Sequence, residues 1–133
     1  MVHLTEQVEQ MTLLERDRRG ELVKELLQSR RSVQYRYPSN WLYPIVRAEE
    51  TTVWRPVDIF LTLEVGDIVI AEPSEVVACR AGHGPHAMSN LFFSVIHDID
   101  IHGWRIGDMS HPPHMYGYCK AEGIYGRLTD VFD

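Results

Sequence analysis

The chain has 133 residues, of which 44% are hydrophobic and 24% charged, and its formal net charge is −6. This length and composition are typical of one globular domain with a buried core, and they exclude a chain that is disordered throughout. No apolar run approaches the roughly 18 residues that cross a bilayer, and the first residues lack the basic-then-apolar pattern of a secretory signal. We therefore expect a soluble, cytoplasmic protein without a membrane partner.

The charge is divided unevenly along the chain. Residues 1–47 carry eight Lys/Arg and six Asp/Glu, whereas residues 48–133 carry five Lys/Arg and thirteen Asp/Glu. The second part, at −8, would repel a phosphate backbone, which excludes nucleic acid as its partner. The basic excess in the first part indicates a solvated helix face, or a helix that docks on an acidic partner.

Residues 5–30 are predicted to be helical. Thr5 is a suitable N-cap, and the capping-box pattern Thr12-Leu13-Leu14-Glu15 offers a second start. Gly20 weakens the middle and offers a break between two helices. Apolar residues recur at helical spacing and predict a stripe that packs on the rest of the chain or on a second copy in a homodimer. The stripe consists of Val8, Met11, Leu14, Leu22 and Leu26, widened by Leu13, Val23 and Leu27.

A change of pattern near residue 35 predicts an N-terminal helical segment, 1–34, and a β-rich domain, 35–133. Pro38 and the aromatic-rich residues 35–43 end the helical region. Short apolar runs punctuated by Gly and Pro then predict strands. The fold class is therefore α+β and mainly β, with a helix or helix pair docked on a barrel-like or sandwich body. The predicted strands are 57–63, 67–71, 75–79, 91–101, 104–106 and 123–131.

The order of several short motifs in residues 35–133 resembles the S24/S26-like serine peptidase fold of signal peptidases and LexA-type proteins. Ser39–Arg47 is similar to that family's Ser-Met-x-Pro segment, and Val65–Ile70 to its Gly-Asp-Ile/Val-Val strand. Phe93–Ile96, Gly107-Asp108 and Ile124–Leu128 are similar to its His-Arg-Val-Ile strand, its Gly-Asp turn and its closing Gly-Arg-Val strand.

The resemblance implies a serine nucleophile with a lysine or histidine base, because a hydroxyl attacks only when a neighbouring group accepts its proton. Ser39 stands at the nucleophile's place, two residues farther from Pro44 than in the family, and the only lysines, Lys24 and Lys120, lie outside the segment that carries the base. Phe93 replaces the family's histidine. A repaired triad would consist of Ser39, His86 (or His83) and Asp108. The preferred interpretation is a domain that has lost catalysis and binds a peptide or protein partner.

Six of the seven histidines lie between His83 and His114, which suggests a metal site as an alternative. Imidazole and carboxylate are common ligands of zinc. Strand alternation places Val95, His97, Ile99 and Ile101 on one face and Ile96, Asp98, Asp100 and His102 on the other. The candidate ligands are Asp100, His102, His111 and His114. No spacing matches an established motif, so the default expectation is a chain without a cofactor.

The remaining hypotheses concern the helix and the two cysteines. A structural dimerisation module built on the amphipathic helix is the third candidate function. Cys79 and Cys119 are far apart and form no CxxC motif, so we expect buried free thiols and no disulfide.

Overall fold

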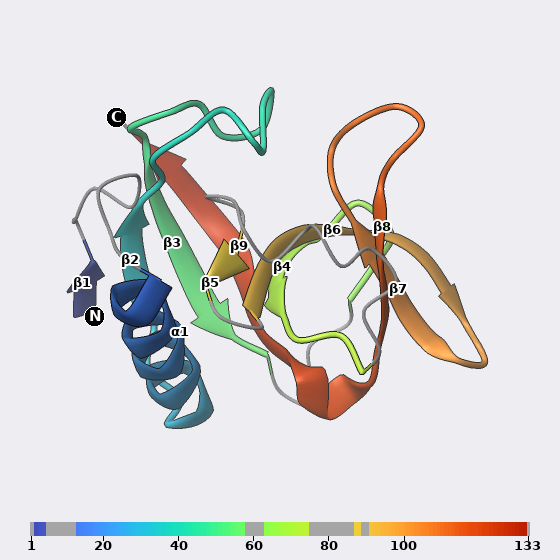
Figure 1. Ribbon diagram of the computed structural model, residues 1–133, viewed down its shortest axis with the longest axis horizontal. Coiled ribbons are helices and arrows are strands. Elements are labelled where there is room, and N and C mark those ends of the chain that lie inside the picture. The colour runs from blue at the N-terminus through green and yellow to red at the C-terminus, as the bar shows by residue number, and fades with distance from the viewer. Residues whose placement is uncertain (1, 5–12, 58–62, 75–86, 89–90, 133) are drawn as a thin grey trace.

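A computed structural model describes residues 2–4, 13–57, 63–74, 87–88 and 91–132 of the chain, and within these ranges it contains one α-helix and nine strands (Figure 1). In chain order the elements are β1 (Val2–Leu4), α1 (Leu13–Gln28), β2 (Val33–Arg36), β3 (Thr51–Pro56), β4 (Ile68–Ala71), β5 (Ala87–Met88), β6 (Leu91–Asp100), β7 (Gly103–Gly107), β8 (Met115–Cys119), the 3-10 turn η3 (Ala121–Gly123) and β9 (Ile124–Phe132).

All nine strands belong to one sheet, in the order β1-β2-β3-β9-β4-β6-β7-β8, with β5 paired to β6. The seven strands from β2 to β8 in that order pair antiparallel, and β1 joins β2 in parallel. Strand β9 links the two halves, because it pairs with β3 along most of its length and with β4 near its start. The sheet curls around this strand into a sandwich-like body and does not close into a barrel (Figure 1).

Helix α1 is continuous from Leu13 to Gln28, so Gly20 does not separate two helices. A single glycine weakens a helix, but packing of the flanking turns on the sheet compensates for it. The first described helical residue, Leu13, follows the predicted second start, whereas Thr5 and residues 6–12 lie outside the described residues. Among the described residues no helix is long and apolar enough to cross a membrane.

The helix packs against β2, β3 and β9 through Val23, Leu26 and Leu27, which are all buried. Leu22, expected in the apolar stripe, is 42% exposed, so the buried face is rotated by about one residue from the predicted one. The docking of a helix on a mainly β body is thus as expected. The homodimer and the domain boundary after residue 34 stay predictions.

Strand β4 and the first six residues of β6 are buried on both faces, so the core lies on both sides of the sheet. Ile68 and Ile70 of β4 face the side covered by α1, together with Phe93. Val69 and Ala71 face the other side. This second cluster also contains Leu63, Phe92, Ile96, Ile106, Tyr116, Cys119 and Ile124. Cys119 is a buried free thiol, as expected, and Cys79 lies outside the described residues.

Four of the predicted strands are confirmed as β4, β6, β7 and β9, whereas β1, β2, β3, β5 and β8 were not predicted. The predicted strand 75–79 and most of 57–63 lie outside the described residues. The predicted alternation along β6 is wrong beyond Ile96. The register with β7 shifts between Ile96 and Asp98, and His102 belongs to the turn after β6. Such a bulge reverses which face each later residue occupies.

Candidate functional site

Two loops that are far apart in the sequence lie against each other and enclose a pocket. The first connects β2 to β3, and the second connects β7 to β8; both extend from the same side of the sheet in Figure 1. The pocket between them has a volume of about 270 Å³. It is lined by Asn40, Trp41 and Tyr43 from the first loop and by Asp108, Met109 and Ser110 from the second. We call it the loop pocket.

The first loop is a compact turn whose apolar side chains point in two directions. Leu42 and Val46 are fully buried and anchor it, and the Val46 amide donates to the Leu42 carbonyl at 3.0 Å. Trp41 and Tyr43, on the other side, are 37% and 55% exposed. The Trp41 indole donates to the Tyr116 hydroxyl at 3.2 Å. This bond fixes the Trp41 ring at the pocket wall.

The second loop is organised around the buried carboxylate of Asp108. Its Oδ1 accepts from the Ser110 hydroxyl (2.6 Å), the Ser110 amide (3.1 Å) and the His114 amide (2.8 Å). Its Oδ2 lies 2.8 Å from Nδ1 of His114. From β6, Nε2 of His97 bonds the Asp108 carbonyl at 2.7 Å. One side chain therefore holds both ends of the loop that forms half of the pocket.

The surroundings of Asp108 favour its ionised form. Burial alone would raise the pKa of this carboxyl, but the hydrogen bonds from Ser110 and His114 outweigh burial and hold its pKa below the usual value. Burial raises the pKa of Tyr116, and the nearby Asp108 charge acts in the same direction, against the opposing bond from Trp41. Tyr116 is therefore a neutral hydroxyl next to an anionic carboxylate.

His114 is held in one orientation by this carboxylate. Because Oδ2 of Asp108 accepts from Nδ1, the neutral ring carries its proton on Nδ1 and its lone pair on Nε2. The His114 side chain is 77% exposed, so the ring is accessible to solvent. A carboxylate that orients an accessible imidazole is the arrangement used by a general base. The Ser110 hydroxyl lies on the Nδ1 side, at 3.1 Å, and so cannot be the group that Nε2 deprotonates.

The residues of the predicted triad are only partly brought together. The segment of Ser39 and that of Asp108 meet at the loop pocket, but Asp108 engages His114, whereas His83 and His86 lie outside the described residues. The Ser39 hydroxyl accepts from the Trp41 amide at 3.2 Å, which is the bond of a turn-forming serine.

Phe93, at the place of the family's histidine, is a core residue. Its ring stacks on Tyr35 at 5.5 Å between centroids and meets Tyr37 edge-on at 5.2 Å. Trp54 lies 5.3 Å away at a tilt. The position at which the resemblance to S24/S26-like peptidases would place a histidine therefore faces an aromatic cluster and not the loop pocket.

The four candidate metal ligands do not converge. Asp100 and His102 lie at the β6–β7 turn and His111 and His114 in the β7–β8 loop, so the two pairs are at opposite ends of β7, roughly 15 Å apart at about 3.3 Å per residue. Asp100 caps its turn by accepting from the His102 amide (2.7 Å) and the Tyr118 hydroxyl (3.0 Å). Within the described ranges, no three His, Cys, Asp or Glu side chains are grouped as a metal site.

Sequence reasoning missed two features of the site. His114 was considered only as a metal ligand, although its spacing from Asp108 across a proline-containing loop is compatible with a side-chain pair. The exposure of Trp41 and Tyr43 was not anticipated, because the aromatic composition of this segment gives no indication of which rings are buried.

Comparison of the chain with models of protein families finds no match. The same holds for comparison with curated protein sequences and with solved structures.

Proposed function

We propose that the chain is an S24/S26-like domain that binds a peptide segment in the loop pocket, with its family's catalytic machinery degenerate. One observation carries the proposal. The two segments that resemble the family's nucleophile segment and its Gly-Asp turn, which are remote in sequence, line the same pocket. Two segments that are remote in sequence and line one pocket can contribute to a single binding site.

The chemistry of the loop pocket suits a peptide. Trp41, Tyr43 and Met109 offer an apolar surface for side chains, and aromatic rings at an accessible position are the usual anchors of an interface. The Asn40 side chain is fixed by a 2.9 Å bond from the Ala48 amide to its Oδ1, so its amino group is the donor it can offer to a peptide carbonyl. Asp108 and the acidic β-rich part of the chain favour a basic or neutral peptide over an acidic one.

Selection from a displayed library of random peptides tests this proposal. Peptides that bind the wild-type chain should bind the Trp41→Ala and Tyr43→Ala variants about tenfold or more weakly, since each change removes an aromatic anchor. Ile101→Ala is the control, because Ile101 is 96% exposed at the tip of the β6–β7 hairpin, outside the loop pocket. Equal affinity of the selected peptides for all four proteins would refute the loop pocket as the binding site.

Hydrolysis of the bound peptide is the second candidate function, and the Asp108–His114 pair favours it. In this alternative Nε2 of His114 accepts a proton from the attacking group, either the Ser39 hydroxyl or water, while Asp108 holds the ring. A cleavage time course with the selected peptides, monitored by intact mass, distinguishes attack by Ser39, attack by water and the absence of catalysis. Loss of cleavage in both Ser39→Ala and His114→Ala supports a serine mechanism, and loss in His114→Ala alone supports attack by water. If the wild type cleaves none of the peptides, the hydrolysis alternative is refuted and only peptide binding remains as the proposed function.

A further inference from the structure

The loop pocket is small, and its two loops contribute different chemistry. Trp41 and Tyr43 line it from the β2–β3 loop, and Asp108 and Met109 line it from the β7–β8 loop. Its volume of about 270 Å³ lies slightly below the roughly 300–1,000 Å³ of small-molecule sites, so it suits one side chain better than a whole ligand. The chemistry of these walls therefore selects the side chain that a bound peptide places there.

The aromatic side chains of the loop pocket remain partly accessible. Tyr43 is 55% exposed and Trp41 is 37% exposed. The Trp41 indole donates to the Tyr116 hydroxyl at 3.2 Å, which holds the indole at the wall. The face of a tryptophan or tyrosine ring carries a negative potential and attracts a cation within about 6 Å of the ring centre. Two such residues in one small pocket favour a cation over an anion.

The negative charge of Asp108 adds to this preference. Burial opposes ionisation of the carboxyl, but the hydrogen bonds from Ser110 and His114 outweigh burial and lower its pKa. Burial and, after it, the Asp108 charge raise the pKa of Tyr116, so the field of the carboxylate reaches the hydroxyl that holds Trp41. None of the six lining residues is a Lys, Arg or His, and the neutral His114 ring brings no charge of its own. The loop pocket therefore lies in a negative field.

The oxygen atoms of the lining residues already accept hydrogen bonds within the chain. The Asp108 carboxylate, 3% exposed, accepts four, which is about the number of its lone pairs. The Asp108 carbonyl is bonded to His97. Both oxygens of Asn40 accept backbone amides, from Tyr43 and Ala48. A lysine ammonium, strongly hydrated and with three donors, would lose water here without regaining its hydrogen bonds, whereas a quaternary ammonium has no N–H group to satisfy.

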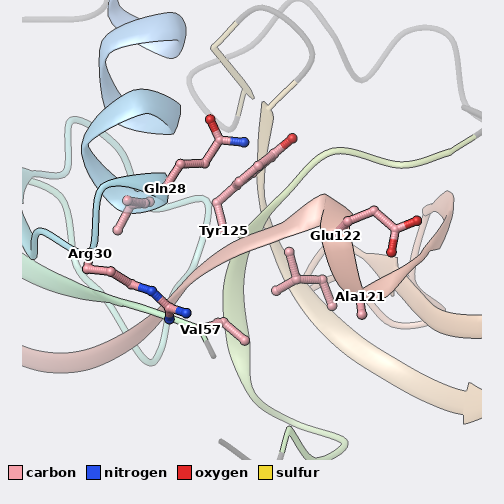
Figure 2. A pocket seen from close by; sticks show the side chains of 8 residues that line it. Gln28, Arg30, Val57, Ala121, Glu122 and Tyr125 are labelled. Atoms are coloured by element: carbon pink, nitrogen blue, oxygen red, sulfur yellow. The ribbon is translucent and has the colours of Figure 1, made fainter. Parts of the chain in front are cut away.

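A second pocket, beside the C-terminal end of α1, differs in both respects (Figure 2). We call it the helix pocket. Tyr125 is the only aromatic residue among the eight that line it, and Nζ of Lys24 already lies 5.4 Å from the centre of that ring. Arg30 and Glu122 border it with charges of opposite sign. The helix pocket is therefore an internal control for the binding of a cation.

We infer that the loop pocket binds a trimethylated lysine side chain of the peptide, with its quaternary ammonium group against Trp41 and Tyr43 and in the field of Asp108. The inference rests on the proposed peptide site and names the residue that this site selects. A neutral side chain of the same shape would lose the attraction to the rings and the carboxylate. Unmodified lysine would keep this attraction but would lose its hydration.

NMR titration of the isotope-labelled chain tests the inference with three probes. They are N-acetyl-trimethyllysine methylamide, the same compound of unmodified lysine, and the neutral isostere with carbon in place of the quaternary nitrogen. At about pH 8, where an exposed imidazole is neutral, the trimethyllysine probe should give saturable shifts at the amides of Tyr43 and Ser110. It should bind about fivefold or more tightly than either other probe, and the amides of Ala121 and Ile124 at the helix pocket should not shift.

Three results would overturn the inference: no saturable shift at the loop pocket, equal shifts at the helix pocket, or binding of the lysine probe or the isostere as tight as that of trimethyllysine.

Variants at Tyr43 separate attraction by the ring from general apolar contact. Tyr43→Leu keeps an apolar side chain without the ring and should weaken binding of the trimethyllysine probe about fivefold or more. Tyr43→Phe keeps the ring and should bind the probe more tightly than Tyr43→Leu does. Ile101→Ala, outside the loop pocket, should bind like the wild type. Equal binding by Tyr43→Leu and Tyr43→Phe overturns the inference.

Failure of this inference is distinguishable from failure of the peptide proposal. If library peptides bind through Trp41 and Tyr43 but the chain has no preference for the trimethyllysine probe, the peptide site stands and the inference is overturned. If the chain prefers the trimethyllysine probe but no library peptide binds, the wider peptide site is refuted and the selection of the trimethyllysine side chain stands.

Discussion

Replacement of Asp108 by asparagine should destabilise the chain more than replacement of any exposed aspartate. The carboxylate is 3% exposed and accepts four hydrogen bonds, from two groups of Ser110 and two of His114. Asparagine keeps the size but loses the charge, and it places an amino group opposite donors that need an acceptor. Hydrogen bonds to a charged group contribute about 1.5–3 kcal/mol each. Where Ser110 and His114 are exposed, water can take the place of the lost acceptor and reduce the loss. We therefore expect a loss of about 2–3 kcal/mol in the free energy of unfolding.

Urea unfolding followed by tryptophan fluorescence measures this loss, and the thermal midpoint should fall by about 8–12 °C in a domain of this size. Asp98→Asn is the matched control: Asp98 is exposed and accepts from the neighbouring Ile99 amide, so the loss of unfolding free energy in this variant should stay within about 0.5 kcal/mol. A loss of the same small size in Asp108→Asn would refute the role of this carboxylate in holding the loop.

The stability difference between the wild type and the Asp108→Asn variant should depend on pH. The pKa of Asp108 is lower in the folded chain than in the unfolded chain, so the stabilisation is complete above the unfolded pKa of about 4 and is lost as pH falls through the folded pKa. The difference in unfolding free energy between wild type and Asp108→Asn should therefore shrink as pH is lowered from about 5 to about 2.5. A difference that stays constant over this range would contradict the assigned hydrogen bonds.

Three further predictions concern the sheet. Gly103→Ala should lower the free energy of unfolding by about 3 kcal/mol or more, because Gly103 has a φ of 121° and a Cβ there would collide with the Cys119 carbonyl. Gly66→Ala should lower it by about 1 kcal/mol, because Gly66 has a φ of 97° but open space around it. Urea unfolding compares the two variants. Phe93→Ala should cost about 3–5 kcal/mol in the same assay, since three aromatic rings pack around it, and a loss below 1 kcal/mol would contradict its place in the core. In a Cys79→Ser background, Cys119 should resist alkylation until the chain unfolds, because burial raises the pKa of its thiol to about 12; fast labelling of the folded chain would contradict this.

Sequence patterns identified the elements whose evidence is local. β4 is a continuous apolar run, and the first six residues of β6 are apolar except for Ser94, as expected of strand segments that are covered on both faces. β3 and β8 were missed because their pairing depends on distant strands: β3 pairs with β2 and β9, and β8, with Gly117 in its middle, has weak strand character of its own. The bulge after Ile96 was unpredictable for the same reason, since it is defined only by the partner strand.

At the candidate site, too, contacts between residues far apart in the sequence could not be predicted. Ser39 and Asp108 were placed in one triad on the basis of the resemblance, which stays a prediction; residues next to Ser39 line the loop pocket together with Asp108. The partner of Asp108 was predicted to be His86 and is His114, because a buried carboxylate takes the donors that its own loop brings to it. Asp100 and His102 were assigned to a metal site on the basis of strand alternation, and the end of β6 at Asp100 removes that basis.

Photo-crosslinking at Tyr43 tests the proposed peptide site most directly. A photoreactive phenylalanine analogue replaces either Tyr43, at the loop pocket, or Ile101, at the tip of the β6–β7 hairpin, and each protein is illuminated with the selected peptides. Peptide adducts at position 43, competed away by unlabelled peptide and lacking at position 101, are the result expected if the loop pocket binds peptide. Adducts of equal yield at both positions, or at position 101 alone, would contradict it.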